Sequence, residues 1–193
     1  MRVAVAVSGR GSNLQALLDR LTGDAPARVA LVLSNRAEAG ALEKARALAI
    51  PAGVLANPAD GDEWLRHLRA ESIDLLVLAG YLKLVPRPVV TGFAGRIINI
   101  HPALLPAFGG PGMYGARVHA AVLASGVKES GATVHLVDEE YDRGEILGQA
   151  RVPVSAGDTP ESLAARILEI EHQLLPAAVL AAAKAGRPVR FTL

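Results

Sequence analysis

Asn99 and His101 are two side chains whose types and spacing suit acyl-transfer chemistry. They are two positions apart at the end of an apolar, β-branched run, so in a strand both point to the same side. An amide N–H can stabilise charge that develops on a carbonyl oxygen, and an imidazole exchanges protons near neutral pH. The alternative is structural: Asn99 ends a strand, and His101 is a buried histidine with satisfied hydrogen bonds.

His101 needs a nearby carboxylate if its imidazole is to hold a proton. The segment from Ile97 to Ala116 contains no Asp, Glu, Lys or Arg, and desolvation there favours the neutral ring. Asp142 is the candidate, in a turn-rich loop with further acids at positions 138 to 140. Loop acids are usually solvated, and spacing along the chain does not choose among these four.

A glycine-rich turn, Ser8-Gly9-Arg10-Gly11-Ser12-Asn13, follows the first apolar run and precedes a helical pattern. Its glycines let the backbone approach a ligand, and free N–H groups at a helix start favour an anion such as phosphate. Leu14 replaces the third glycine of the dinucleotide fingerprint, and no triphosphate-binding loop motif is present. The turn therefore predicts a phosphate monoester rather than NAD or ATP. The alternative is a capping box formed by Ser12 and Gln15.

Short apolar runs alternate with helical patterns, which predicts a doubly wound, mostly parallel, Rossmann-like α/β sheet. The expected strands are Val3–Val7, Val29–Leu33, Ala52–Leu55, Leu75–Leu78 and Ile97–Ile100, and the expected helices are Asn13–Leu21, Glu38–Ala49, Glu63–Glu71 and Pro88–Phe93. Next come a helix over Arg117–Ser125 and an antiparallel portion, Ala132–Val137 with Ile146–Val152. A long C-terminal helix starts at Asp158-Thr159-Pro160-Glu161, and Pro176 should end or kink it.

Composition bounds the class of protein. A chain of 193 residues with 51% hydrophobic residues suits one domain, 1–193, with its own core. Twenty basic and nineteen acidic residues give a net charge of +1, which argues against nucleic acid or a membrane surface as a partner. There is no cysteine and no signal or membrane-helix segment, so we expect a soluble, cytoplasmic protein. The histidines lack metal-ligand spacing, and we expect no metal.

Taken together, several segments resemble the phosphoribosylglycinamide formyltransferases, the folate-dependent transformylases of purine synthesis. The block Asn99–Pro106, Asn-Ile-His-Pro-Ala-Leu-Leu-Pro, is specific to folate formyltransferases and their hydrolase relatives. The other matching segments are Ser8–Gln15, Val32–Arg36, Leu78–Leu82, Gly131–His135 and Asp142–Gly144, followed by Ile146 and Gln149. The resemblance implies one formyltransferase domain, with a phosphate-binding half over 1–100 and a folate-binding, catalytic half over 101–193.

The resemblance also implies roles for residues at the matched positions. The catalytic trio corresponds to Asn99, His101 and Asp142. The residues that bind the ribonucleotide correspond to Gly11, Ser12 and Asn13 at its phosphate and Glu171 at its amino group. The residues that bind the formyl donor correspond to Leu82, Lys83, Leu84 and Val85, whose backbone reads the pterin ring, and Asn99. Leu105-Pro106 takes the place of a cis peptide bond.

One departure concerns the glutamate tail of the folate. The segment Ala59-Asp60-Gly61 lacks the arginine that the family often places near this tail. Lys83 and Arg66 are possible substitutes, and we assign neither.

The implied reaction moves a formyl group from N10 of 10-formyltetrahydrofolate, a cosubstrate, to the amine of glycinamide ribonucleotide. Asn99 and His101 would stabilise the tetrahedral intermediate, while Asp142 assists proton transfer. Formyltetrahydrofolate hydrolase carries a preceding domain and methionyl-tRNA formyltransferase a following one, so chain length argues against both. A non-catalytic module that holds a phosphorylated metabolite is the alternative from another class. Monomer and homodimer both stay open.

Overall fold

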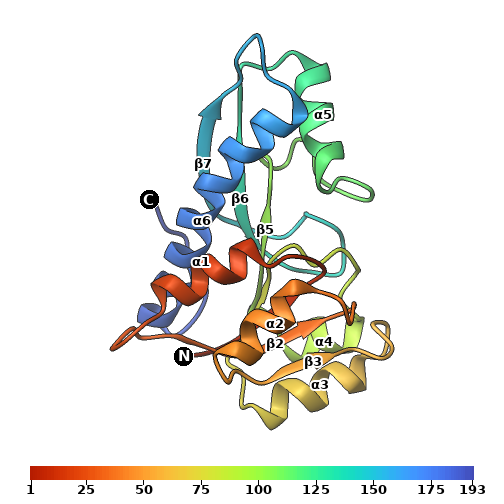
Figure 1. The fold of residues 1–193 in the computed structure, drawn as a ribbon, viewed down its shortest axis with the longest axis vertical. Coiled ribbons are helices and arrows are strands. Elements are labelled where there is room, and N and C mark those ends of the chain that lie inside the picture. Colours follow the sequence, from red (N-terminus) through yellow and green to blue (C-terminus); the bar gives the residue numbers. More distant parts are fainter.

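The computed structural model describes residues 1–193, which form one seven-stranded sheet flanked by helices (Figure 1). The strands are β1 (Arg2–Val7), β2 (Arg28–Ser34), β3 (Ala52–Val54), β4 (Leu75–Leu78), β5 (Ile97–His101), β6 (Glu129–Leu136) and β7 (Ile146–Pro153). The helices are α1 (Ser12–Arg20), α2 (Gly40–Ala47), α3 (Gly61–Ala70), α4 (Arg87–Gly92), α5 (Ala116–Ser125) and α6 (Pro160–Ala185). None of them has the length and apolar character that crossing a membrane requires.

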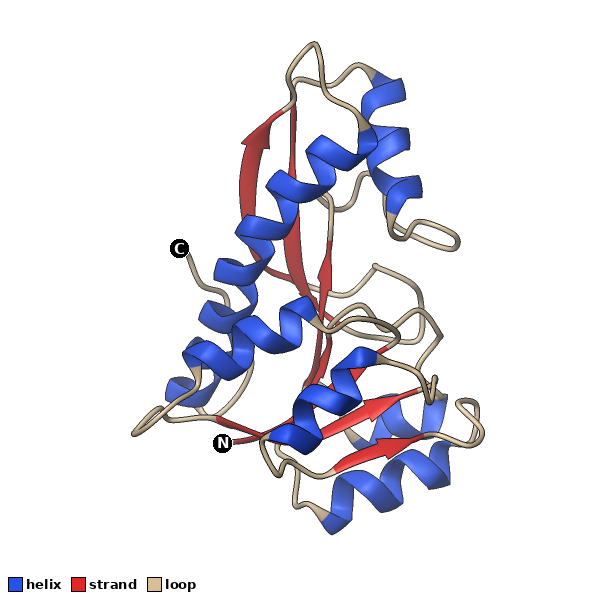
Figure 2. Cartoon of the chain, viewed as in Figure 1, coloured by secondary structure: helices blue, strands red, loops and turns tan.

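The strand order is β3-β2-β1-β4-β5-β6-β7. The strands from β1 to β5 pair in parallel, whereas β6 and β7 are antiparallel (Figure 2). This confirms the predicted doubly wound, mostly parallel sheet with an antiparallel C-terminal portion. The chain moves outward from β1 to β3 and then returns to β4 on the other side of β1. The carboxyl ends of β1 and β4 therefore flank a switch point, where open α/β sheets bind ligands.

Alternation along β1 shows how both faces of the sheet are covered. Val3, Val5 and Val7 pack in one core with residues of α1, α2, α5 and α6. Ala4 and Ala6 pack in a second core with residues of α3 and α4. All five side chains are fully buried, which explains why this strand is a continuous apolar run rather than an alternating one.

The C-terminal helix begins where the sequence predicts and continues beyond its proline. Thr159 and Ser162 form a capping box, each side chain accepting a hydrogen bond from the backbone N–H of the other. Pro176 does not end α6, which continues to Ala185. The proline is buried, and packing of this helix face against the sheet compensates for the missing N–H group.

Candidate active site

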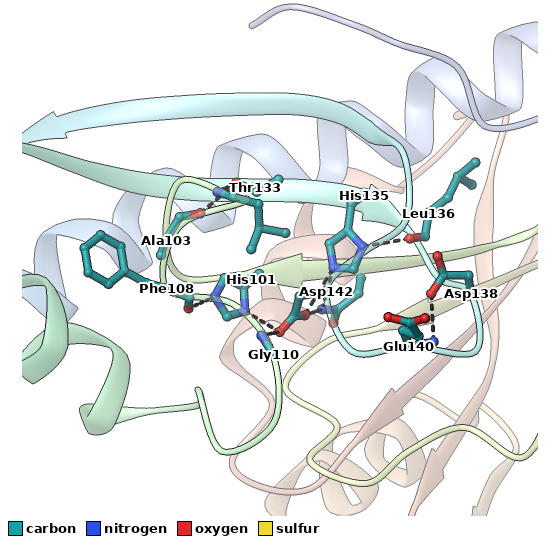
Figure 3. A network of polar contacts seen from close by, with 12 residues as sticks. His101, Ala103, Phe108, Gly110, Thr133, His135, Leu136, Asp138, Glu140 and Asp142 are labelled. Carbon is teal, nitrogen blue, oxygen red and sulfur yellow. Dashed lines mark hydrogen bonds and ion pairs between the residues drawn. The ribbon is translucent and has the colours of Figure 1, made fainter.

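The loop between β6 and β7 brings Asp142 to His101, one of the two predicted side chains of β5 (Figure 3). Asp142 Oδ2 lies 3.6 Å from His101 Nδ1, and Asp142 Oδ1 lies 3.5 Å from Asn99 Nδ2. His101 is 3% exposed, and the Asp142 side chain is 9% exposed. Residues that are 43 positions apart in the sequence thus form one buried polar cluster.

The structure also distinguishes Asp142 from the other acids of its loop. Asp142 has a left-handed backbone conformation, with φ 57°, and its Oδ2 accepts a hydrogen bond from Gly110 N at 2.9 Å. The other acids have contacts elsewhere: Asp138 with Glu140 N, Glu139 with Arg87, and Glu140 with Arg143. Asp142 is the one acid of this loop that faces His101.

His135 joins the cluster from β6, and sequence reasoning gave it no role in the site. It is the partner of Asn99 in the antiparallel pairing of β5 and β6. His135 Nδ1 donates to Leu136 O at 2.7 Å, so Nε2 of the neutral ring is an acceptor. This Nε2 receives a hydrogen bond from Asn99 Nδ2 at 3.0 Å and lies 3.4 Å from Asp142 Oδ1. Strand alternation was the available signal, but it does not reveal the register between two strands.

His101 is arranged to gain and lose a proton on the side that faces Asp142. Its Nε2 lies 2.8 Å from Phe108 O, and because a carbonyl only accepts, Nε2 carries the hydrogen of the neutral ring. Nδ1 is then the atom that takes up a proton. Burial lowers the pKa of His101, and the nearby Asp142 carboxylate opposes this shift without reversing it. The resting imidazole is therefore neutral at pH 7.

Asp142 keeps its negative charge although it is buried. Burial alone would raise the pKa of this carboxyl. The nearby His135 ring, the charge of protonated His101 and the N–H of Gly110 outweigh burial, and the pKa of Asp142 lies below its usual value. The cluster thus holds a carboxylate beside a neutral imidazole, ready to stabilise that ring when it is protonated.

The cluster lines a cavity of about 270 Å³. The four residues predicted to read the pterin ring also line it: Leu82, Lys83, Leu84 and Val85. The backbone N–H and C=O groups of residues 83–85 make no hydrogen bond within the chain. Free backbone groups in a largely apolar cavity suit a flat heterocycle with polar edges. Of the two residues considered for the folate tail, Lys83 lines this cavity and Arg66 does not.

The glycine-rich turn leaves helix α1 open at its N-terminus. Gly11 precedes the helix with φ 73°, and no side chain caps it. The alternative of a Ser12–Gln15 capping box is wrong, because the Gln15 side chain contacts Asp19 and Lys44 instead. The N–H groups of the first turn are therefore free to bind an anion. A side chain at position 11 would place Cβ 2.6 Å from Cβ of Ala41, in α2.

Glu171 faces this turn and does not line the cavity beside Asn99. Its Oε2 accepts a hydrogen bond from Asn13 Nδ2 at 2.7 Å, and both side chains are buried. Burial raises the pKa of Glu171 to about 6, partly opposed by the hydrogen bond from Asn13. Asn13 Oδ1 is buried and has no partner. An unpaired acceptor beside a carboxylate suits a ligand that carries N–H donors.

Two polar side chains without a predicted role hold the loop that follows His101. Thr133 Oγ1 donates to Ala103 O at 2.7 Å and accepts from Leu105 N at 3.1 Å. Gln149 Nε2 donates to Thr133 Oγ1 and to Leu105 O, both at 2.9 Å. The Leu105-Pro106 peptide bond is cis, as the resemblance implies. These contacts fix the start of the loop whose later part touches the polar cluster.

The known proteins that this chain resembles include formyltransferases. Residues 1–179 match the family described as formyl transferase. The chain is 48% identical over 181 residues to the chloroplastic phosphoribosylglycinamide formyltransferase of Arabidopsis thaliana, covering 90% of this chain and 62% of that protein. It is 40% identical over 182 residues to the phosphoribosylglycinamide formyltransferase of Haemophilus influenzae, covering 91% and 84%.

Solved structures give the same result. The crystal structure of phosphoribosylglycinamide formyltransferase from Anaplasma phagocytophilum superimposes with a TM-score of 0.89 at 41% identity, over 95% of this chain and 87% of that one. The chain spans about three fifths of the length of the two plant relatives, from Arabidopsis thaliana and Vigna unguiculata.

Proposed function

Because the chain belongs to the formyl transferase family, in its phosphoribosylglycinamide formyltransferase branch, we propose that it formylates the amino group of glycinamide ribonucleotide from 10-formyltetrahydrofolate, in purine biosynthesis. The observation that carries this proposal is the convergence of Asn99, His101 and Asp142 on one cavity. Both substrates are small molecules, and the proposed reaction uses no metal, nucleic acid or membrane partner. We expect it to take place in the cytoplasm.

The two substrates bind on either side of the switch point between β1 and β4. The ribonucleotide phosphate lies at the N-terminus of α1, where Gly11, Ser12 and Asn13 offer backbone N–H groups, and Glu171 receives the amino group. The pterin ring lies along residues 82–85, whose free backbone groups pair with its polar edge. Support comes from the open helix start, the unpaired Asn13 Oδ1 and the unpaired backbone of residues 83–85.

In the proposed reaction the amine nitrogen bonds to the formyl carbon, and the bond from that carbon to N10 breaks. Asn99 Nδ2 gives up its long 3.5 Å contact with Asp142 and donates that hydrogen to the formyl oxygen as negative charge develops there. One proton moves from the amine to N10. His101 takes it up at Nδ1 and then releases it, and Asp142 stabilises the imidazolium in between. The neutral resting imidazole and the low pKa of Asp142 support this order of events.

The test is to mix the protein with the formyl donor, with and without glycinamide ribonucleotide, and to follow deformylated folate by its absorbance. Release that requires the ribonucleotide supports transfer. Release without it would identify a hydrolase, because water would then be the acceptor. Binding of both compounds without release would identify a non-catalytic binding protein.

A further inference from the structure

Ser8 begins the glycine-rich turn, but its side chain faces a different segment of the chain. Its hydroxyl donates to Asn35 Oδ1 at 2.6 Å and accepts from Leu82 N at 2.9 Å. Its own N–H donates to Gly80 O at 3.0 Å. Ser8 is 3% exposed, and its hydroxyl's hydrogen bonds to Asn35 and Leu82 are partly buried. Ser8 thus holds the chain on both sides of Tyr81.

The hydrogen bond to Leu82 is the only one that any backbone group of residues 81–85 makes. The next backbone anchor is Pro86, whose carbonyl accepts from the N–H groups of Val89 and Val90 at the start of α4. Tyr81 contributes a side-chain anchor, an edge-to-face contact with Trp64 at 5.3 Å between ring centres. That contact holds the ring of Tyr81, whereas Ser8 sets the direction of the backbone that follows it.

The contacts of the Ser8 hydroxyl leave it unsuited to bind phosphate. A serine hydroxyl has a single hydrogen, and here Asn35 receives it. A phosphate oxygen needs a donor, so the hydroxyl has nothing to offer it while this contact lasts. The remaining residues of the turn keep their free N–H groups for that purpose. Ser8 therefore lies in the phosphate turn along the sequence, but its hydrogen bonds hold the segment from Gly80 to Leu82.

Building on the function proposed above, we propose that Ser8 is a positioning residue for the formyl donor, which it serves by fixing the backbone of residues 82–85 that receives the pterin ring. Without the hydroxyl, the Leu82 N–H would lose its one partner in the chain, at a partly buried position. The segment would then move to pair this group with water. The backbone groups of residues 82–85 that bind the donor would be displaced, while the N–H groups of the phosphate turn would stay in place.

The first experiment does not depend on any reaction. In the protein without ligands, Ser8→Ala should speed hydrogen exchange of the Leu82 amide by about tenfold, measured by NMR. Ser34→Ala is the matched control: it also removes a buried hydroxyl near this edge, one that accepts from Arg36 N at 3.1 Å. Ser34→Ala should leave hydrogen exchange of the Leu82 amide unchanged. Unchanged exchange at Leu82 in Ser8→Ala would overturn the proposal, whatever the activity.

The second experiment compares the two substrates in steady-state kinetics. Ser8→Ala should raise KM for the formyl donor about tenfold, with KM for the ribonucleotide and kcat within about twofold of wild type. Ser8→Thr keeps a hydroxyl and should restore the donor KM. A rise confined to the ribonucleotide KM would place Ser8 in the phosphate cradle and overturn the proposal. If Ser8→Ala shows the predicted faster exchange at Leu82 but the wild-type protein transfers no formyl group, the proposed function would be contradicted and the effect of Ser8 on the backbone would stand.

If Ser8→Ala does not fold, Asn35 offers a second route. Asn35→Ala removes the acceptor that orients the Ser8 hydroxyl, so it should change Leu82 exchange and donor KM in the same direction, by about threefold. Asn35→Asp keeps an acceptor oxygen and should behave as wild type. Equal behaviour of the two Asn35 variants would overturn the proposal.

Discussion

The polar cluster around Asn99 and the glycine-rich turn at Gly11, for which we propose phosphate binding, lie at the same edge of the sheet but are built in opposite ways. In the cluster, His101, His135 and Asp142 contact one another and nearby backbone groups. In the turn, the N–H groups that open α1 are uncapped, and Asn13 Oδ1 is unpaired.

Each arrangement suits a different task. Groups that stabilise charge and move protons must be held in fixed orientations before the substrate arrives. A subsite for a charged ligand must keep its donors free. Variants of the cluster should therefore reduce turnover, whereas variants of the turn should weaken binding of the ribonucleotide.

The largest effect should follow loss of a group that acts on the reacting atoms. Asn99→Ala and His101→Ala should each lower kcat by about 10²–10³-fold, because one removes the donor to the formyl oxygen and the other the proton carrier. KM for the ribonucleotide should change little. Steady-state kinetics test this, with urea unfolding curves as the control for folding. Near wild-type turnover in both variants would show that the cluster is not the catalytic centre.

A loss of about 10² in kcat should follow Asp142→Asn. The carboxamide can still accept from Gly110 N, so the loop should stay in place. Without the negative charge the pKa of His101 falls further, and the limb of the pH–kcat profile that reports His101 moves to lower pH. Glu140→Gln, at an exposed acid of the same loop, is the matched control. A profile unchanged by Asp142→Asn would mean that another acid serves His101.

Glu171→Gln should show how much stability the protein loses by burying an ionised carboxylate beside the glycine-rich turn. Burial raises the pKa of Glu171 from 4.5 to about 6, so its contribution to stability is complete below pH 4.5 and is lost as pH rises through about 6. Glutamine does not ionise and can still accept from Asn13. The variant should be about 2 kcal/mol more stable than wild type at pH 8 and equally stable near pH 4. Its ribonucleotide KM should rise.

Urea unfolding at these two pH values measures the difference. The same stability gain at both would rule out ionisation of Glu171 as its cause.

The smallest effect should follow Gly11→Ala, with an increase of about tenfold in ribonucleotide KM and little change in kcat. Alanine at φ 73° is strained, and its Cβ would push against Ala41 and shift the start of α1. Gly23→Ala, at φ 57° with nothing within 4 Å, measures the backbone strain alone and should leave KM unchanged. If kcat falls as far as KM rises, the turn and the cluster are not separate in function.

Local patterns were sufficient to predict most of the framework. The apolar run Val3–Val7 became β1, Thr159-Pro160 began α6, and the glycine-rich turn lies directly before α1. Strand alternation, helix capping and glycine geometry depend on neighbours within a few residues, so they can be read along the chain. The resemblance added Asn99, His101 and Asp142 as candidates, which the structure places together.

Contacts between distant segments could not be read in this way. The choice of Asp142 over three neighbouring acids depends on a loop conformation held by Gly110, and the place of His135 beside Asn99 depends on the β5–β6 register. The pairing of Ser8 with Leu82 depends on β1 and β4 being neighbours in the sheet. The amino-acid order set which elements form, because those forces are local. The tertiary fold set which side chains come into contact, because register and loop closure depend on the packing of the whole sheet.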